Sequence, residues 1–223
     1  MNYDIKAVIF DLDGTLVNSL ADLAGAANHV LAEAGYPVHP VEAYRYFVGN
    51  GLDVLLRRAL PGGQPSTQEA YAALLERVRQ RYDTHWHDKT VPYPGMAGLL
   101  AELVRRGLPI MVLSNKPDPW VAPCVRYFFP EVRFDIVRGA LPDVPRKPDP
   151  QAAQALAMQA GVAPENVAFV GDSNVDMRTA VNAGMAAFGA TWGFRERDEL
   201  LAAGAGVLLE RPDDLLKWVQ KTA

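Results

Sequence analysis

Two aspartates stand one residue apart directly after an apolar run near the N-terminus. The run covers residues 7–10 and leads into Asp11, Asp13, Gly14 and Thr15. A short apolar run with polar boundaries is typical of a buried parallel strand, and open α/β sheets bind ligands outside the carboxyl ends of their strands. Two carboxylates in a loop that a glycine allows to turn sharply could hold a divalent cation and attack an electrophile. A solvated pair of turn acids is the alternative for this segment alone.

Two later segments repeat the order of strand, polar residues and helix. Ser114 and Asn115 follow an apolar run that begins at residue 109, so a hydroxyl and an amide are expected at the end of that strand. Lys147 precedes a predicted helix with Asp149 as its N-cap and Pro150 as its first residue. The sequence therefore predicts a hydrogen-bonding pair and a cation beside the two aspartates.

A further pair of acids follows the apolar run that begins at Val167. Asp172 ends this run, and Asp176 lies four residues later. A helix that begins between them places both carboxylates on one side. Taken alone, Asp176 is better explained as an acid favoured by the helix dipole.

The elements that must position these residues fall into a helical region and a region of alternating strands and helices. From Ser19 to about Trp86 no run looks like a buried strand, and the apolar residues repeat with helical spacing. Ser19 and Asp22 resemble a capping box at the start of the first helix, a second helix covers about 52–59, and a second capping box over 66–69 begins the third.

After residue 90 strands and helices alternate. Predicted helices cover about 95–106, 118–129, 149–160 and 174–183, and further strands cover about 134–137, 186–190 and 207–209. We therefore predict an α/β protein. Its Rossmann-like, doubly wound parallel-sheet core comprises residues 1–17 and 90–223, and an inserted all-helical cap domain comprises 18–89.

The order and spacing of the four polar segments resemble the haloacid-dehalogenase-like hydrolase superfamily over essentially the whole chain. The D-x-D-G-T sequence at residues 11–15 is the strongest element of this likeness. Within the superfamily the chain is most similar to phosphoglycolate phosphatases, through residues 47–51, 114–117, 146–150 and 191–194. The resemblance implies an enzyme that hydrolyses a small-molecule phosphate monoester, with 2-phosphoglycolate as the expected substrate.

The resemblance also implies roles for the acids. Asp11 would attack phosphorus and become an aspartyl phosphate, while Asp13 would protonate the leaving oxygen and later deprotonate the hydrolytic water. Mg²⁺ is the implied cofactor, held by Asp11, Asp172 and the main-chain carbonyl of Asp13. Asp176 would orient metal-bound waters or Lys147.

Substrate contacts are expected from both parts of the chain. Ser114 and Asn115 would donate hydrogen bonds to the phosphoryl oxygens, and Lys147 would offset their charge. The expected phosphate- and substrate-binding set is Thr15, Ser114, Asn115, Lys147, Gly49, Asn50 and Gly51. For the last three, a tight turn between two cap helices is the alternative.

Composition limits the partners. The net charge of −4 at pH 7 and the absence of a basic run argue against a nucleic-acid partner. The single cysteine, Cys124, permits no internal disulfide. The N-terminus does not resemble a signal peptide, and no apolar segment reaches the length of a membrane span. We expect a soluble cytoplasmic monomer or homodimer.

Two other functions remain open from the sequence. A phosphosugar mutase of the same superfamily would leave phosphate on the sugar product. A non-enzymatic phosphoacceptor module would also use an aspartate at a strand end, but such a module needs only about half this length and no helical insertion.

Overall fold

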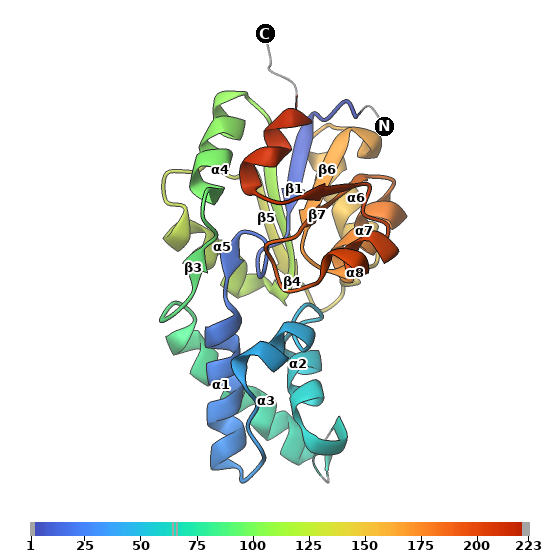
Figure 1. Cartoon of the computed structure of the whole chain (residues 1–223). Helices are drawn as coiled ribbons and strands as arrows, with labels where there is room; N and C mark the ends of the chain where they lie inside the picture. The colour runs from blue at the N-terminus through green and yellow to red at the C-terminus, as the bar shows by residue number, and fades with distance from the viewer. Residues whose placement is uncertain (1–2, 64, 66, 220–223) are drawn as a thin grey trace. The chain divides into compact units, whose positions relative to one another are not determined.

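The structure, a computed structural model, describes residues 3–63, 65 and 67–219. The chain separates into two compact units. One comprises Met1–Val17 and Pro92–Ala223, and the other comprises Asn18–Val91. The first unit contains the large sheet and the second is helical (Figure 1). A role for the helical unit as a cap remains a proposal.

The first unit is built on one six-stranded sheet with the order β5-β4-β1-β6-β7-β8. Its strands are β1 (Ala7–Phe10), β4 (Ile110–Pro117), β5 (Ile136–Ala140), β6 (Val167–Gly171), β7 (Ala186–Ala190) and β8 (Val207–Leu209). Neighbouring strands pair in parallel throughout the described sheet. The chain moves outward from β1 to β5 and then returns to β6 beside β1, so the strand order reverses between β1 and β6. Ligands of open α/β sheets bind at such a reversal.

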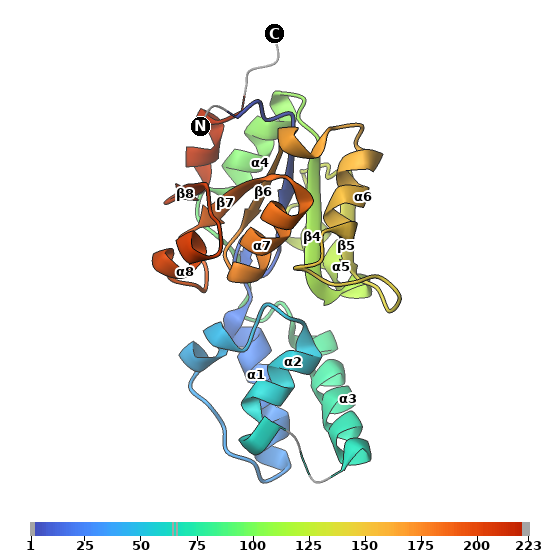
Figure 2. The same ribbon diagram turned by 90° about the vertical axis from the view of Figure 1, so that its right-hand side faces the viewer.

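Helices cover both faces of this sheet (Figure 2). They are α4 (Met96–Arg105), α5 (Asp118–Phe128), α6 (Gln151–Gln159), α7 (Asn174–Ala183) and α8 (Arg197–Ala202), with short 3-10 helices η3 (Pro164–Asn166) and η4 (Pro212–Lys217). On one face, Ile9 and Phe169 pack with residues of α6, α7 and α8. Successive side chains of a strand alternate between faces, so Phe10, which is also fully buried, belongs to the other face, where α5 contacts β4 and β5. The predicted doubly wound parallel core is confirmed.

The second unit consists of helices α1 (Leu20–Glu33), α2 (Leu52–Ala59) and α3 (Gln68–His85), with 3-10 helices η1 (Val41–Tyr46) and η2 (Pro61–Gly63). Helix α3 packs against α1 and α2. Two short strands, β2 (Val17–Asn18) and β3 (Val91–Pro92), pair where the chain passes between the units. In the described part of the chain, no helix is long and apolar enough to cross a membrane.

The predicted capping box at the start of α1 is wrong. Ser19 is the N-cap residue but makes no side-chain cap hydrogen bond. The buried Asp22 carboxylate instead accepts hydrogen bonds from the main-chain N–H groups of Lys89 and Thr90, at 3.0 and 2.8 Å, and from the Thr90 hydroxyl at 2.7 Å. These donors come from a segment far along the chain, which local sequence spacing cannot reveal.

The start of α3 differs from the second predicted capping box. Ser66 lies outside the described residues. The N-cap of α3 is Thr67, whose hydroxyl accepts a hydrogen bond from the N–H of Ala70 at 3.1 Å. A Thr N-cap satisfies one of the free N–H groups of the first helical turn.

Several boundaries also differ from the sequence-based expectation. Strand β4 continues to Pro117, so Ser114 and Asn115 lie within the strand rather than after it. Helix α6 begins at Gln151 with Pro150 as N-cap, although the Asp149 carboxylate still accepts a hydrogen bond from the N–H of Gln151 at 2.9 Å. Strand β5 lies slightly later than expected, and α8 was not predicted. Boundary residues depend on pairing with neighbouring segments, and β4 shows this through an irregular register with β5.

Candidate active site

Three buried carboxylates meet where the strand order reverses. Asp11 follows β1, Asp172 follows β6, and Asp176 belongs to the first turn of α7. One oxygen from each lies within 4.8 Å of the others. The residues are 7%, 2% and 0% exposed. Sequence segments about 160 residues apart therefore form one acidic cluster, hereafter the carboxylate cluster.

Burial and mutual repulsion raise the pKa of two members of this cluster. Desolvation raises the pKa of Asp11 well above its usual value, with repulsion from Asp176 adding to it and Lys147 opposing it. Desolvation, with Asp176 adding, also raises the pKa of Asp172 to about 7. A dication would relieve this repulsion, and Mg²⁺ prefers carboxylate oxygens. The donor set of the cluster therefore fits a divalent metal ion.

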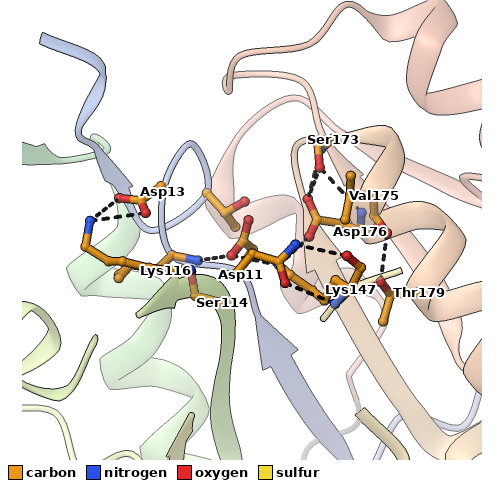
Figure 3. A network of polar contacts seen from close by, with 12 residues as sticks. Asp11, Asp13, Ser114, Lys116, Lys147, Ser173, Val175, Asp176 and Thr179 are labelled. Carbon is orange, nitrogen blue, oxygen red and sulfur yellow. Dashed lines mark hydrogen bonds and ion pairs between the residues drawn. The ribbon is translucent and has the colours of Figure 1, made fainter. Parts of the chain in front are cut away.

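Lys147 contacts the carboxylate cluster directly. Its Nζ lies 2.9 Å from Oδ1 of Asp11 and 2.7 Å from Oδ1 of Asp176 (Figure 3). Burial opposes the charged form, but Asp11 and Asp176 outweigh it and the pKa of Lys147 lies above its usual value. Lys147 therefore remains an ammonium beside the strand-end aspartate.

Asn115 holds the main chain of Lys147. The Asn115 amide donates to the Lys147 carbonyl at 3.0 Å, and the N–H of Lys147 donates to Oδ1 of Asn115 at 3.0 Å. In the structure this side chain fixes the loop that carries the lysine. The expected hydrogen bond from Asn115 to the phosphoryl oxygens stays a prediction.

The N-terminus of α7 orients Asp176. The N–H and hydroxyl of Ser173 donate to Oδ2 of Asp176 at 3.0 and 2.6 Å, and the N–H of Asp176 lies 3.4 Å from the Ser173 hydroxyl. This reciprocal arrangement is a capping box. A Cβ at Gly171 would overlap the Asp176 side chain, so a residue without a side chain is required there. The capping box leaves Oδ1 of Asp176 directed toward Lys147.

Asp172 is held by two loops of the same unit. The hydroxyl of Thr15 donates to Oδ1 at 3.2 Å, and the N–H of Phe194 donates to Oδ2 at 2.8 Å. Gly14 and Gly193 lie against Asp172, and a Cβ at either position would overlap that side chain. Gly14 also has a φ of 90°, which favours glycine. Thr15, predicted to bind phosphate, therefore contacts a predicted metal ligand.

Sequence reasoning missed Lys116. Its Nζ lies 3.1 and 3.2 Å from the two carboxylate oxygens of Asp13 (Figure 3). Both side chains are largely buried, at 4% and 12% exposure. The hydroxyl of Ser114 accepts a hydrogen bond from the N–H of Lys116 at 3.2 Å. A lysine inside a strand that is otherwise buried was the available signal, because a lysine there needs a charged partner.

Gly49, Asn50 and Gly51 belong to the helical unit. The φ angles of the two glycines are 113° and 88°, in the region that favours glycine. Arg58 donates to Oδ1 of Asn50 at 2.9 Å and to the carbonyl of Phe47 at 3.1 Å. The segment is thus a tight turn that Arg58 holds before α2, and its contact with substrate remains a proposal.

The chain belongs to the haloacid dehalogenase-like hydrolase family, whose sequence profile matches residues 8–190. It is 36% identical to a phosphoglycolate phosphatase of Mannheimia succiniciproducens over 98% of this chain and 100% of that protein. A phosphoglycolate phosphatase of Pseudomonas putida is 35% identical, with coverage of 92% of this chain and 76% of the relative. The crystal structure of a predicted phosphoglycolate phosphatase from Haemophilus somnus superposes with a TM-score of 0.88 at 30% identity, covering 96% of this chain and 97% of that one. These findings confirm the family, and the chain is a hydrolase by class.

Proposed function

We propose that this chain is a Mg²⁺-dependent phosphatase that hydrolyses 2-phosphoglycolate to glycolate and phosphate through an aspartyl phosphate. The observation that supports the proposal most is the contact of Lys147 with both Asp11 and Asp176 at the sheet reversal. A nucleophilic carboxylate beside a fixed ammonium and two further acids is suited to an anionic phosphoryl group and a divalent ion. The proposed substrate follows from the names of the similar proteins.

Each protein group in the proposed reaction has a definite task. One oxygen of Asp11 attacks phosphorus, the ester P–O bond breaks, and Asp13 gives its proton to the leaving oxygen. Asp13 then takes a proton from water as that water attacks phosphorus, the bond between phosphorus and Asp11 breaks, and phosphate leaves. Two steps through a covalent intermediate replace one slow displacement, which matters because the uncatalysed hydrolysis of phosphate monoesters is extremely slow.

The proposed metal site uses Asp11, Asp172 and the main-chain carbonyl of Asp13. Mg²⁺ bound there would offset the charge of the carboxylates and of the phosphoryl oxygens. Asp176 acts through Lys147, which it contacts at 2.7 Å. Lys147 and the Ser114 hydroxyl are the proposed phosphate contacts.

Thr15 and Asn115 have supporting tasks in this proposal. Thr15 donates to Asp172, and Asn115 binds the main chain of Lys147. We therefore assign them to the positioning of the metal ligand and of the lysine. We further propose that the helical unit acts as a cap whose turn at Gly49–Asn50–Gly51 contacts the leaving group.

The test of this function is Mg²⁺-dependent release of phosphate from a panel of small esters that includes 2-phosphoglycolate. Activity should disappear with excess chelator and return with Mg²⁺. Ca²⁺ should support little turnover, because it is larger and accepts more ligands in looser geometry. Full activity in excess chelator would exclude the metal role. A poor rank for 2-phosphoglycolate in the panel would contradict the substrate assignment.

The same assay separates the two alternative functions. A phosphosugar mutase converts a sugar phosphate into its isomer without net release of phosphate. A phosphoacceptor module retains phosphate on Asp11 without repeated turnover. Equal amounts of glycolate and phosphate over many turnovers support the phosphatase.

A further inference from the structure

We propose that Lys116 forms a carboxylate-binding subsite, which the carboxylate of Asp13 occupies in this structure and the carboxylate of the substrate occupies during the reaction. The inference rests on the proposed function and names the chemical class of the leaving group. It assigns a task to a buried cation that the reaction steps above do not use.

The geometry of Lys116 is that of an ion-binding site. Its Nζ contacts both oxygens of one carboxylate, at 3.1 and 3.2 Å, and its side chain is 4% exposed. A buried ammonium is costly unless an anion compensates it. Lys147 is already compensated by two carboxylates of the cluster. The carboxylate that compensates Lys116 is that of Asp13, which is also the proposed general acid.

The reaction requires Asp13 to leave this position or to share it. As general acid, Asp13 must come within hydrogen-bond distance of the ester oxygen. A carboxylate that turns toward the ester oxygen gives up at least one of its contacts with Nζ of Lys116. The vacated donor is buried, and a second carboxylate compensates it better than water does.

A carboxylate near the ester oxygen can reach this donor. When a single oxygen of Asp13 contacts both groups, one contact of 3.1 Å and one hydrogen bond place the ester oxygen within about 6 Å of Nζ. A carboxylate one methylene beyond the ester oxygen covers about half of this distance, which leaves about one hydrogen-bond length. Lys116 thus suits an ester of a short 2-hydroxy acid, and 2-phosphoglycolate is the smallest such ester.

The exchange also links substrate recognition to chemistry. A substrate carboxylate that binds Lys116 displaces the carboxylate of Asp13, which takes up a proton from solvent and turns as a carboxylic acid toward the leaving oxygen. An ester without a carboxylate leaves Asp13 on Lys116. Binding energy from a non-reacting part of the substrate then contributes to kcat as well as to KM.

The experiment uses three esters of similar size that differ in charge. They are 2-phosphoglycolate, 2-hydroxyethyl phosphate and phosphoethanolamine, assayed with Mg²⁺ on the full chain. The parent enzyme should show the highest kcat/KM for the carboxylate ester and the lowest for the ammonium ester. In Lys116→Met the ratio of kcat/KM between the carboxylate ester and the hydroxyl ester should fall at least tenfold, and the ammonium ester should gain relative to the hydroxyl ester.

Two controls separate this subsite from a structural role. Lys6→Met removes an exposed lysine whose Nζ lies 3.0 Å from Asp4, and it should leave all three ratios as they are. If Lys116 only holds Asp13 in place, Lys116→Met and Lys116→Gln lower kcat/KM by one common factor for all three esters, which overturns the subsite.

The parent enzyme alone provides a readout that needs no folded variant. Hydrolysis of all three esters without preference for the carboxylate ester overturns the subsite and leaves the phosphatase proposal standing. No hydrolysis of any of the three overturns the proposed function and the subsite with it.

Discussion

Asp11, the nucleophile of the proposed reaction, is attracted by the ammonium of Lys147 and repelled by two neighbouring carboxylates. Lys147 lies 2.9 Å from Asp11, whereas burial, with Asp176 and Asp172 adding to it, raises the pKa of Asp11. This balance makes the metal-free site unstable electrostatically and receptive to a cation. Residues arranged for catalysis often reduce the stability of the fold in this way.

Replacement of Asp11 by Asn should abolish turnover and preserve the fold. The amide has nearly the same shape but cannot act as the carboxylate nucleophile. We expect phosphate release from 2-phosphoglycolate to fall by at least about 1,000-fold, as when other nucleophiles are removed. The thermal midpoint should not decrease, because one buried negative charge is removed. Asp4→Asn is the matched control at an exposed aspartate, and turnover of Asp11→Asn within tenfold of the parent would refute the covalent mechanism.

Asp172 should make the metal-free protein less stable as the pH rises. Its pKa is about 7 in the fold against 3.8 for the free side chain, so the folded state binds more protons between these values. Its destabilising contribution is absent below about pH 3.8, grows as the pH rises, and is complete above about pH 7. The Tm of the chelated protein should therefore be higher at pH 5.5 than at pH 8.

Asp172→Asn provides the variant for this prediction. At pH 8 it should raise the metal-free Tm by about 2 °C or more, since 1 kcal/mol corresponds to about 2–4 °C in a chain of this size. It should also reduce the gain in Tm that Mg²⁺ produces in the parent. A lower Tm than the parent in chelator at pH 8 would contradict the prediction.

At the scale of secondary-structure elements, the site depends on the first turn of α7. Ser173 and Asp176 form a capping box in this turn. The Asp176 side chain also accepts a hydrogen bond from Nζ of Lys147. A helix terminus is a stiff support, so the direction of this carboxylate follows from the backbone of α7. The tight passage at Gly171, where a Cβ would overlap Asp176, completes the support.

Ser173→Ala should therefore lose activity as well as stability. Loss of the cap should cost about 1 kcal/mol of unfolding free energy, and kcat should fall about tenfold because Asp176 no longer holds Lys147 in one direction. Thr67→Ala is the matched control, since Thr67 caps α3 through a bond of 3.1 Å to Ala70 in the helical unit. It should lower Tm with little change in kcat. Equal effects of the two substitutions on kcat would show that the cap of α7 acts only on stability.

At the scale of the whole molecule, the chain divides the proposed tasks between two units. The unit of Met1–Val17 and Pro92–Ala223 contains the carboxylate cluster, Lys116 and Lys147. The unit of Asn18–Val91 contains the turn at Gly49–Asn50–Gly51. In our proposal the first performs the chemistry and binds the carboxylate of the substrate, and the second contacts the leaving group.

Asn50→Leu tests this division. It should lower kcat/KM for 2-phosphoglycolate at least tenfold more than for p-nitrophenyl phosphate, whose hydrolysis depends less on contacts with the cap. Arg58→Met is the matched control, because Arg58 holds the same turn through Asn50 and the carbonyl of Phe47 while Asn50 itself is retained. Equal losses on both esters for Asn50→Leu would reduce the segment to a structural turn.

The sequence by itself determined the elements and the positions of the strongest chemistry. The apolar run before Asp11 is strand β1, and the run before Asp172 is strand β6. The helix predicted over 174–183 and the strands over 186–190 and 207–209 have the expected bounds. These features depend on periodicity and on neighbours within a few residues, which a sequence displays directly.

Only the tertiary structure decided which groups these polar side chains contact. Asp13 meets Lys116 across 103 positions of sequence, Thr15 meets Asp172 across 157, and Asn115 meets Lys147 across 32. Asp22 does not form the expected local cap and accepts hydrogen bonds from N–H groups 67 and 68 residues away. A buried polar group pairs with whichever donor or acceptor the packed elements bring to it, and parallel strands bring distant segments to the same edge of the sheet.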